Sequence, residues 1–115
     1  MIPAVPLPAN SRIRRTVDFK LKLAWRFNPD RRVFVSEAGE RVTPAADLPK
    51  RSRILAKVPN LAFADQASLS PAERDLSRYF QVILPPGEPP DRYVDAVRAW
   101  PAVEHADISP EVSLP

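Results

Sequence analysis

The sequence predicts an α+β domain, specifically a βαββαβ sandwich with an extra N-terminal hairpin. Two observations lead to this fold class. Apolar and polar residues alternate at period two through residues 17–27, which is typical of a strand with one buried face. The C-terminal part reads strand, helix, strand, because apolar runs at 79–84 and 102–108 flank helical spacing over 93–100. With 115 residues, the chain is long enough for one domain with one core.

The first predicted element is a single long strand. Its apolar positions are Val17, Phe19, Leu21, Leu23, Trp25 and Phe27. The segment Asn28-Pro29-Asp30 has turn chemistry and precedes a second apolar run at 32–36, so a hairpin is expected there. A second turn at 37–40, which contains Gly39, leads to Val42.

A helix followed by a short strand is predicted in the middle of the chain. The Asp47 carboxylate can accept hydrogen bonds from free amides of a first helical turn, and apolar residues recur on one face as far as Val58. Pro59 would end this helix. The run 60–64 is predicted to be a short strand.

The next helix has the clearest start signal in the chain. Ser70 and Glu73 have the spacing of a capping box, with Pro71 at the first helical position, so we expect a short helix to about Ser77. After the strand at 79–84, Pro101 ends the helix that precedes the last strand. The resulting order is that of the ferredoxin-like arrangement.

The two ends of the chain are expected to lie outside this domain. Residues 1–15 are predicted to form a disordered, proline-rich arm, residues 16–108 a single domain, and residues 109–115 an extended tail or linker. The apolar start is short, broken by prolines and followed by its positive charges, which fits neither a signal peptide nor a membrane span. The chain has no cysteine, which slightly favours a cytoplasmic location.

Charge is distributed unevenly along the chain. Residues 1–58 carry 13 Lys/Arg and 5 Asp/Glu, whereas residues 59–115 carry 4 and 9. On the predicted long strand, Lys20, Lys22 and Arg26 fall on the polar side. This basic face has three interpretations: a solvated surface, a site for an acidic protein, or a nucleic-acid site. The aromatic residues point to the other side, so bases would lack a stacking platform, which disfavours nucleic acid.

The sequence contains no recognisable catalytic, metal or cofactor motif. His105 is the single histidine, and its acidic neighbours in sequence do not form a triad on a strand. No His pair or Cys cluster has metal-ligand spacing, and two distant glycines do not make a phosphate-binding loop. We therefore expect a non-enzymatic module that binds another macromolecule and needs no cofactor or metal.

The C-terminal third carries a family resemblance. Leu76-Ser-Arg-Tyr-Phe-Gln-Val82, Tyr93-Val-Asp-Ala-Val-Arg-Ala-Trp-Pro-Ala-Val-Glu-His-Ala106, and the later Pro110 and Pro115 resemble the stretch ahead of the catalytic domain in bacterial subtilisin-like serine proteases of peptidase family S8. The resemblance implies an N-terminal prodomain with a ferredoxin-like fold. Such a prodomain acts as an intramolecular chaperone and inhibitor of its protease.

The same resemblance implies a binding mode. The sheet would pack on the protease catalytic domain, in cis or in trans, and the C-terminal extension would run through the substrate cleft. The residues implied in this protease-binding tail are Asp107, Ile108, Glu111, Val112, Ser113 and Leu114. The chain departs from the family in that no catalytic Asp, His or Ser segment follows, and Ile108 stands where an aromatic residue or proline is common.

Two alternatives remain open at this level. The tail can be read as a simple frayed end instead of a binding segment. The whole domain can be read as a basic nucleic-acid-binding or protein adaptor module.

Overall fold

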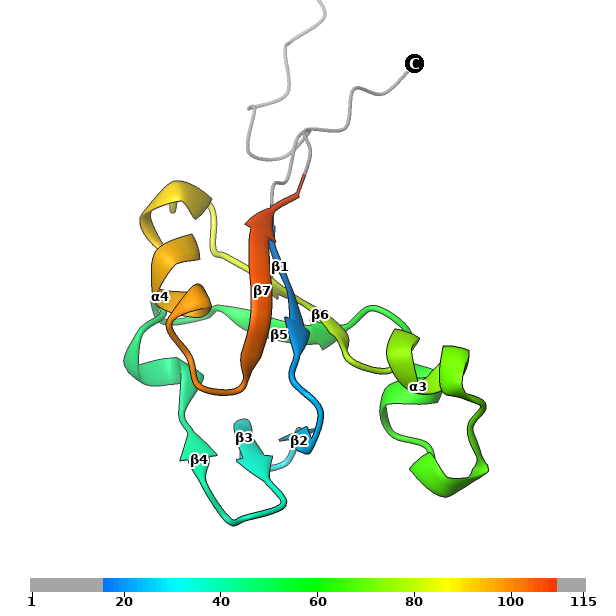
Figure 1. Cartoon of the computed structure of the whole chain (residues 1–115). Helices are drawn as coiled ribbons and strands as arrows, with labels where there is room; N and C mark the ends of the chain where they lie inside the picture. Colours follow the sequence, from blue (N-terminus) through cyan, green and yellow to red (C-terminus); the bar gives the residue numbers. More distant parts are fainter. Residues whose placement is uncertain (1–15, 110–115) are drawn as a thin grey trace, which may run out of the picture.

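A computed structural model describes residues 16–109 as an α+β domain with two antiparallel sheets and few helices (Figure 1). The four-stranded sheet has the order β5-β6-β1-β7, and the three-stranded sheet has the order β2-β3-β4. The strands of the first are β5 (Arg53–Ala56), β6 (Tyr79–Ile83), β1 (Val17–Leu21) and β7 (Val103–Ile108). Those of the second are β2 (Trp25–Asn28), β3 (Val33–Ser36) and β4 (Arg41–Val42).

Short helices connect the strands. The α-helices are α2 (Pro59–Ala62), α3 (Pro71–Leu76) and α4 (Val94–Arg98). The 3-10 helices are η1 (Pro44–Ala46), η2 (Gln66–Ser68) and η3 (Pro90–Arg92). Within residues 16–109, no helix has both the length and the apolar character needed to cross a membrane.

The register of the four-stranded sheet places its buried apolar residues on one face. Phe19 lies opposite Phe80 of β6 on one side and Ala106 of β7 on the other. Val17 is likewise paired with Val82 and Ile108. Because side chains alternate along each strand, these pairs share a face, and that face forms the core.

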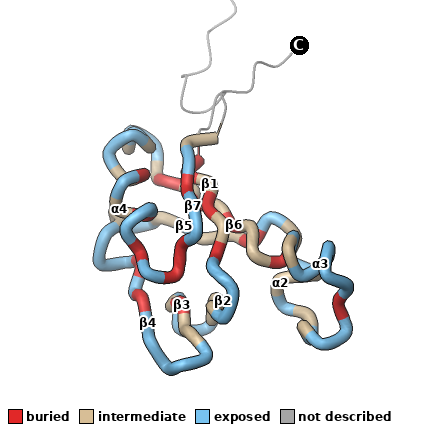
Figure 2. Tube along the Cα trace, viewed as in Figure 1, coloured by how far each residue is buried: buried red, intermediate tan, exposed pale blue. Residues whose placement is uncertain are grey.

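A second layer of mixed structure covers this apolar face. The ring of Phe19 packs edge-on against Phe34 of β3, with centroids 5.6 Å apart, and against Trp100 at 6.0 Å. Val94 and Val97 of α4 are also buried in the core. Helix α4 and the three-stranded sheet together cover the larger sheet, and Figure 2 shows buried residues on β1, β6, β7 and α4.

Several sequence predictions are confirmed. The predicted hairpin is β2-β3, and the predicted second turn joins β3 to β4, where Gly39 has the positive φ of 90° that a tight turn requires. Helix α3 starts with the expected capping box: Ser70 Oγ accepts a hydrogen bond from the Glu73 amide, and the Glu73 carboxylate accepts one from the Ser70 amide. The strand, helix, strand order of the C-terminal part is also confirmed.

The prediction of one long strand over residues 17–27 is wrong. The chain turns after Leu21, with Ala24 at a φ of 72°, and β2 then joins the other sheet. Leu23, predicted to face the core, is 73% exposed. The turn leaves the alternation intact, so period two alone does not separate one strand from two.

The predicted helix at 47–58 and strand at 60–64 are also wrong. Residues 53–56 form strand β5 at an edge of the sheet, and the segment after Val58 forms α2. Asp47 does not start a helix: it lies at the C-terminal end of η1, and its carboxylate accepts a hydrogen bond from Trp100 Nε1 at 2.9 Å. Pro59 occupies the first turn of α2, a position that favours proline, and so starts a helix where it was expected to end one.

Both predicted terminal segments fall mainly beyond the described residues. The N-terminal arm at 1–15 and tail residues 110–115 are outside them. Ser109, at the predicted start of the tail, is bonded to the domain. Its amide donates to the Thr16 carbonyl at 2.8 Å, and its hydroxyl oxygen accepts from the Thr16 amide at 2.8 Å.

Candidate protein-binding surfaces

The face of the four-stranded sheet that points away from the core is the first candidate surface, and we call it the outer face. It is formed by Asp18, Lys20, Arg53, Leu55, Tyr79, Gln81, Ile83, His105 and Asp107. None of these side chains is buried. Gln81 lies near the centre, paired with Asp18 on one side and Leu55 on the other. The face thus combines half-exposed apolar groups with charged ones.

Lys20, one of the three residues of the predicted basic face, is an internal partner of acidic groups. Its Nζ lies 2.7 Å from the Asp75 carboxylate and 3.5 Å from that of Glu104, and 5.0 Å from the centre of the Tyr79 ring. The side chain is only 12% exposed. The hydrogen bond to Asp75 raises the pKa of Lys20, and the same bond lowers the pKa of Asp75.

Lys22 and Arg26 do not share a strand with Lys20. Lys22 lies in the turn after β1, and Arg26 lies on β2 in the other sheet. Both are exposed. The structure therefore does not bring the three cations together into one stripe.

Of the predicted tail residues, Asp107 and Ile108 lie within β7. Asp107 is exposed on the outer face, where the Arg98 guanidinium donates to its carboxylate at 3.1 Å. Ile108 is half-buried beside Val17 on the core side. Glu111, Val112, Ser113 and Leu114 lie outside the described residues.

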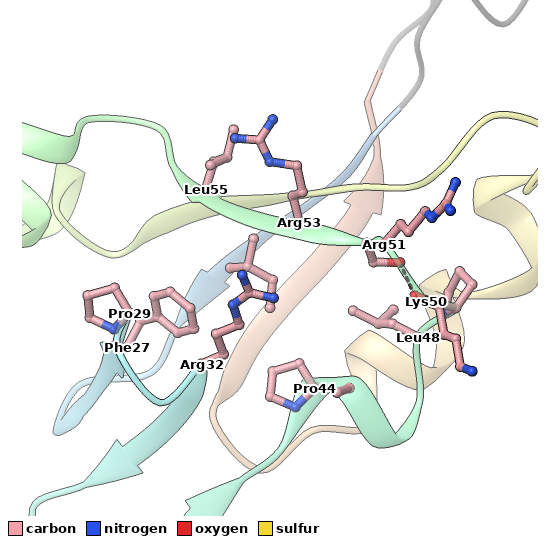
Figure 3. Close-up of a pocket in the computed structure, with 13 residues that line it drawn as sticks. Phe27, Pro29, Arg32, Pro44, Leu48, Lys50, Arg51, Arg53 and Leu55 are labelled. Carbon is pink, nitrogen blue, oxygen red and sulfur yellow. Dashed lines mark hydrogen bonds between the residues drawn. The ribbon is translucent and has the colours of Figure 1, made fainter.

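A second candidate surface, which the sequence analysis missed, is a pocket of about 360 Å³ beside β5 (Figure 3). Its apolar wall includes Phe27, Pro44, Leu48 and Ile54. Its cationic residues are Arg32, Lys50, Arg51 and Arg53, and none of residues 16–109 that line it is acidic. The four cations come from the β2-β3 turn, the loop before β5 and β5 itself. The local excess of cations over residues 50–53 was the sequence signal, but its pairing with Arg32 required the fold.

The histidine considered for catalysis in the sequence analysis lies on the four-stranded sheet. His105 is exposed on the outer face, where its ring lies 6.5 Å from that of Tyr79. No group of three or more His, Cys, Asp or Glu side chains between residues 16 and 109 is placed to hold a metal ion.

Comparison with known proteins gave no match: no protein-family model, curated sequence or solved structure is significantly similar to this chain. The arguments about function therefore rest on the sequence and the geometry.

Proposed function

We propose that this domain is a prodomain-type chaperone and inhibitor that binds a subtilisin-like serine protease. The observation that carries the proposal is the strand order β5-β6-β1-β7 with every neighbouring pair antiparallel. Numbering only these four strands along the chain gives the order 2-3-1-4. That order supports the ferredoxin-like arrangement expected from the family resemblance, with the three-stranded sheet in place of the first helix.

The outer face supports docking of a partner in the expected manner. One side of the sheet is covered by α4 and the three-stranded sheet, and the other carries half-exposed Leu55, Tyr79 and Ile83. Exposed apolar groups gathered on one face are typical of protein interfaces. The protease surface is proposed to cover this face.

The position of β7 supports the role of the tail. It is an edge strand, and the chain continues from it into residues 110–115. A segment that continues an edge strand can run on in extended form beside a second protein. The proposed cleft-binding residues are Glu111, Val112, Ser113 and Leu114, and backbone pairing is the proposed mode of binding.

The test measures residual peptidase activity of a panel of mature subtilisin-like proteases mixed with the full chain in molar excess. Inhibition of at least one member is expected, together with a higher refolding yield of that protease. Removal of residues 110–115 should abolish inhibition. It should leave the fold intact because Ser109 and its bonds to Thr16 are retained.

Two further variants separate docking from folding. Gln81→Arg places a long cation at the centre of the outer face, beside Asp18, and should weaken inhibition without unfolding the domain. Leu23→Arg makes the same kind of change at a residue that is 73% exposed outside this face and should have no effect. Absence of both inhibition and refolding assistance across the panel would overturn the proposal.

The alternative of a nucleic-acid-binding or adaptor module receives less support. The predicted basic face does not form a stripe of free cations for nucleic acid, because Lys20 is paired with Asp75, Lys22 lies in the turn after β1 and Arg26 lies in the other sheet.

A further inference from the structure

Strand β5 is an edge strand whose outer side has no partner among residues 16–109. The Lys57 amide donates to the Tyr79 carbonyl at 2.9 Å, which continues the register of Leu55 with Gln81 and Arg53 with Ile83. Hydrogen bonding alternates along an antiparallel strand, so the backbone groups of Ile54 and Ala56 point away from β6. With no partner among the described residues, these groups present donors and acceptors at the sheet edge.

The pocket beside β5 adjoins this edge. Residues 52–55 form one wall, and the β2-β3 turn, η1 and the loop before β5 form the rest. In Figure 3 the Arg32 side chain extends from its turn toward β5, between Phe27 and Leu48. The volume of about 360 Å³ is within the range typical of ligand pockets in proteins.

The positive charge of the pocket indicates which kind of ligand fits it. Within the described part of the chain, none of the cations Arg32, Lys50, Arg51 and Arg53 has a carboxylate in ion-pairing distance. All four are exposed around the half-buried apolar wall. An occupant that fits offers carboxylates to these cations and an apolar side chain to the wall.

We propose that the free edge of β5 and its cationic pocket bind an extended acidic peptide segment of a partner protein. The segment adds to the sheet as a further strand, with backbone bonds to Ile54 and Ala56. Its side chains alternate between the two faces of the sheet: apolar ones lie on the side of Phe27 and Leu48, where Arg32 also extends, and acidic ones lie on the outer face beside Arg53. The site lies at the edge opposite to β7, and the inference does not depend on the proposed protease binding.

The probe for the test is a short fluorescent peptide of alternating glutamate and valine, with binding followed by fluorescence anisotropy. It should bind the full chain with an affinity that falls as salt rises. Peptides of alternating lysine and valine, or of glutamate and serine, should bind at least about tenfold more weakly. The first lacks carboxylates for the cations, and the second lacks apolar side chains for the pocket wall. Equal binding of the three peptides would overturn the proposal.

Charge reversal in the protein locates the site. The double variant Arg32→Glu, Arg53→Glu should weaken binding by about tenfold or more. The matched double variant Arg26→Glu, Arg41→Glu changes two exposed cations outside the pocket and should leave the affinity within about twofold after correction for net charge. Equal losses in both double variants would show nonspecific charge attraction and overturn the site.

N-methylation of the peptide tests strand addition without any change to the protein. Methyl groups on the alternate amides that face β5 should abolish binding, whereas methyl groups on the other amides should be tolerated. The Ile54 amide should gain protection from hydrogen exchange in the complex. Equal tolerance of both methylation patterns, without protection of Ile54, would overturn strand addition.

A final variant identifies the source of the peptide. A chain that ends at Ser109 should bind the probe with the affinity of the full chain. Much tighter binding by the shortened chain, reversed by a peptide of residues 110–115, would mean that this segment occupies the site, and would overturn the partner proposal.

Discussion

The two edges of the four-stranded sheet differ in how their backbone groups are used. At the β7 edge, Arg98 of α4 reaches around the strand, and its Nε donates to the Ala106 carbonyl at 2.8 Å. The same guanidinium also bonds to Asp107 of β7 and Asp95 of α4. At the β5 edge, no described side chain bonds to Ile54 or Ala56, and cations surround a pocket instead.

The two edges limit pairing with an incoming strand in different ways. A long side chain that occupies an outward carbonyl competes with any incoming strand, so β7 is protected at that position. Beside β5 the positive charge repels other basic segments and admits an acidic one. One edge is closed by a hydrogen bond and the other is made selective by charge.

The largest change expected is from Trp100→Ala, which should loosen both edges together. Trp100 is 4% exposed, packs on Phe19 and Phe34, and bonds to Asp47 in the loop that leads to the pocket. Its removal should lower the free energy of unfolding by about 3–5 kcal/mol, measured by urea denaturation. Leu23→Ala, at a residue 73% exposed, is the control and should change it by less than about 0.5 kcal/mol. A similar small loss for Trp100→Ala would contradict the packing described.

Arg98→Ala should separate the two edges. Loss of the bonds to Ala106 and Asp107 should lower stability by about 1–2 kcal/mol, near the lower value because the side chain is 48% exposed. Hydrogen exchange should accelerate at β7 and remain unchanged at β5. Arg92→Ala, which removes a longer ion pair of 3.9 Å to Glu88, is the matched control. Faster hydrogen exchange at both β5 and β7 would contradict the difference described between the two edges.

Ser70→Ala should affect neither edge. Loss of the cap of α3 should cost about 1 kcal/mol by urea denaturation, because the Glu73 amide loses its partner at the helix start. Ser70→Asp keeps a side-chain acceptor and should retain most of the stability. Altered hydrogen exchange at β5 or β7 in Ser70→Ala would show that α3 is coupled to the edges.

The smallest effect expected is a loss of stability in acid, which arises from two carboxylates of α3. Bonds to Lys20 lower the pKa of Asp75, and bonds to Ser70 lower that of Glu73. A lowered pKa contributes stability above the ordinary values of 3.8 and 4.5, which is lost as pH falls through the lower folded value. The raised pKa of Lys20 acts in the opposite sense, so its contribution is present below 10.5 and is lost only at higher pH.

Urea denaturation across pH checks this expectation. Stability from these groups should be flat from about pH 5 to pH 10 and fall below pH 4. Asp75→Asn should make the free energy of unfolding decrease less steeply at low pH, and the matched change Asp91→Asn, at an exposed residue of η3, should not. An unchanged decrease at low pH in Asp75→Asn would contradict the role of the Lys20 bond.

Local signals in the sequence were reliable where the determining contacts are local. The capping box at Ser70 and the turn at Gly39 depend on neighbours within a few residues, and both were predicted. The register of β5 depends on β6, which follows α2 and α3 in the chain, so the helical spacing of apolar residues as far as Val58 was misleading. Tertiary pairing outweighs weak local propensity in such segments.

The candidate sites also differ in whether local sequence or the tertiary fold determines them. The family resemblance suggested the C-terminal tail from short motifs, and that tail lies largely beyond the described residues. The basic face was derived from strand periodicity and failed because the turn at Ala24 moves Arg26 to another sheet. The pocket joins Arg32 to Arg53 across the fold, and no linear pattern brings these residues together.

The pairing of β1 with both β6 and β7 has a consequence for how the chain folds. Strand β1 is central in the sheet but lies at the N-terminal end of the domain in sequence, whereas its partner β7 lies at the C-terminal end. The Thr16–Ser109 hydrogen bond spans 93 residues. Such distant closure is expected to slow folding, and a chain emerging from the ribosome completes the sheet only after residue 109 is free. The closeness of Thr16 and Ser109 also permits a short linker between them, with new ends opened at the exposed Gly39 turn. In that permuted chain β7 would precede β1 directly, and their pairing would become a local hairpin that forms early.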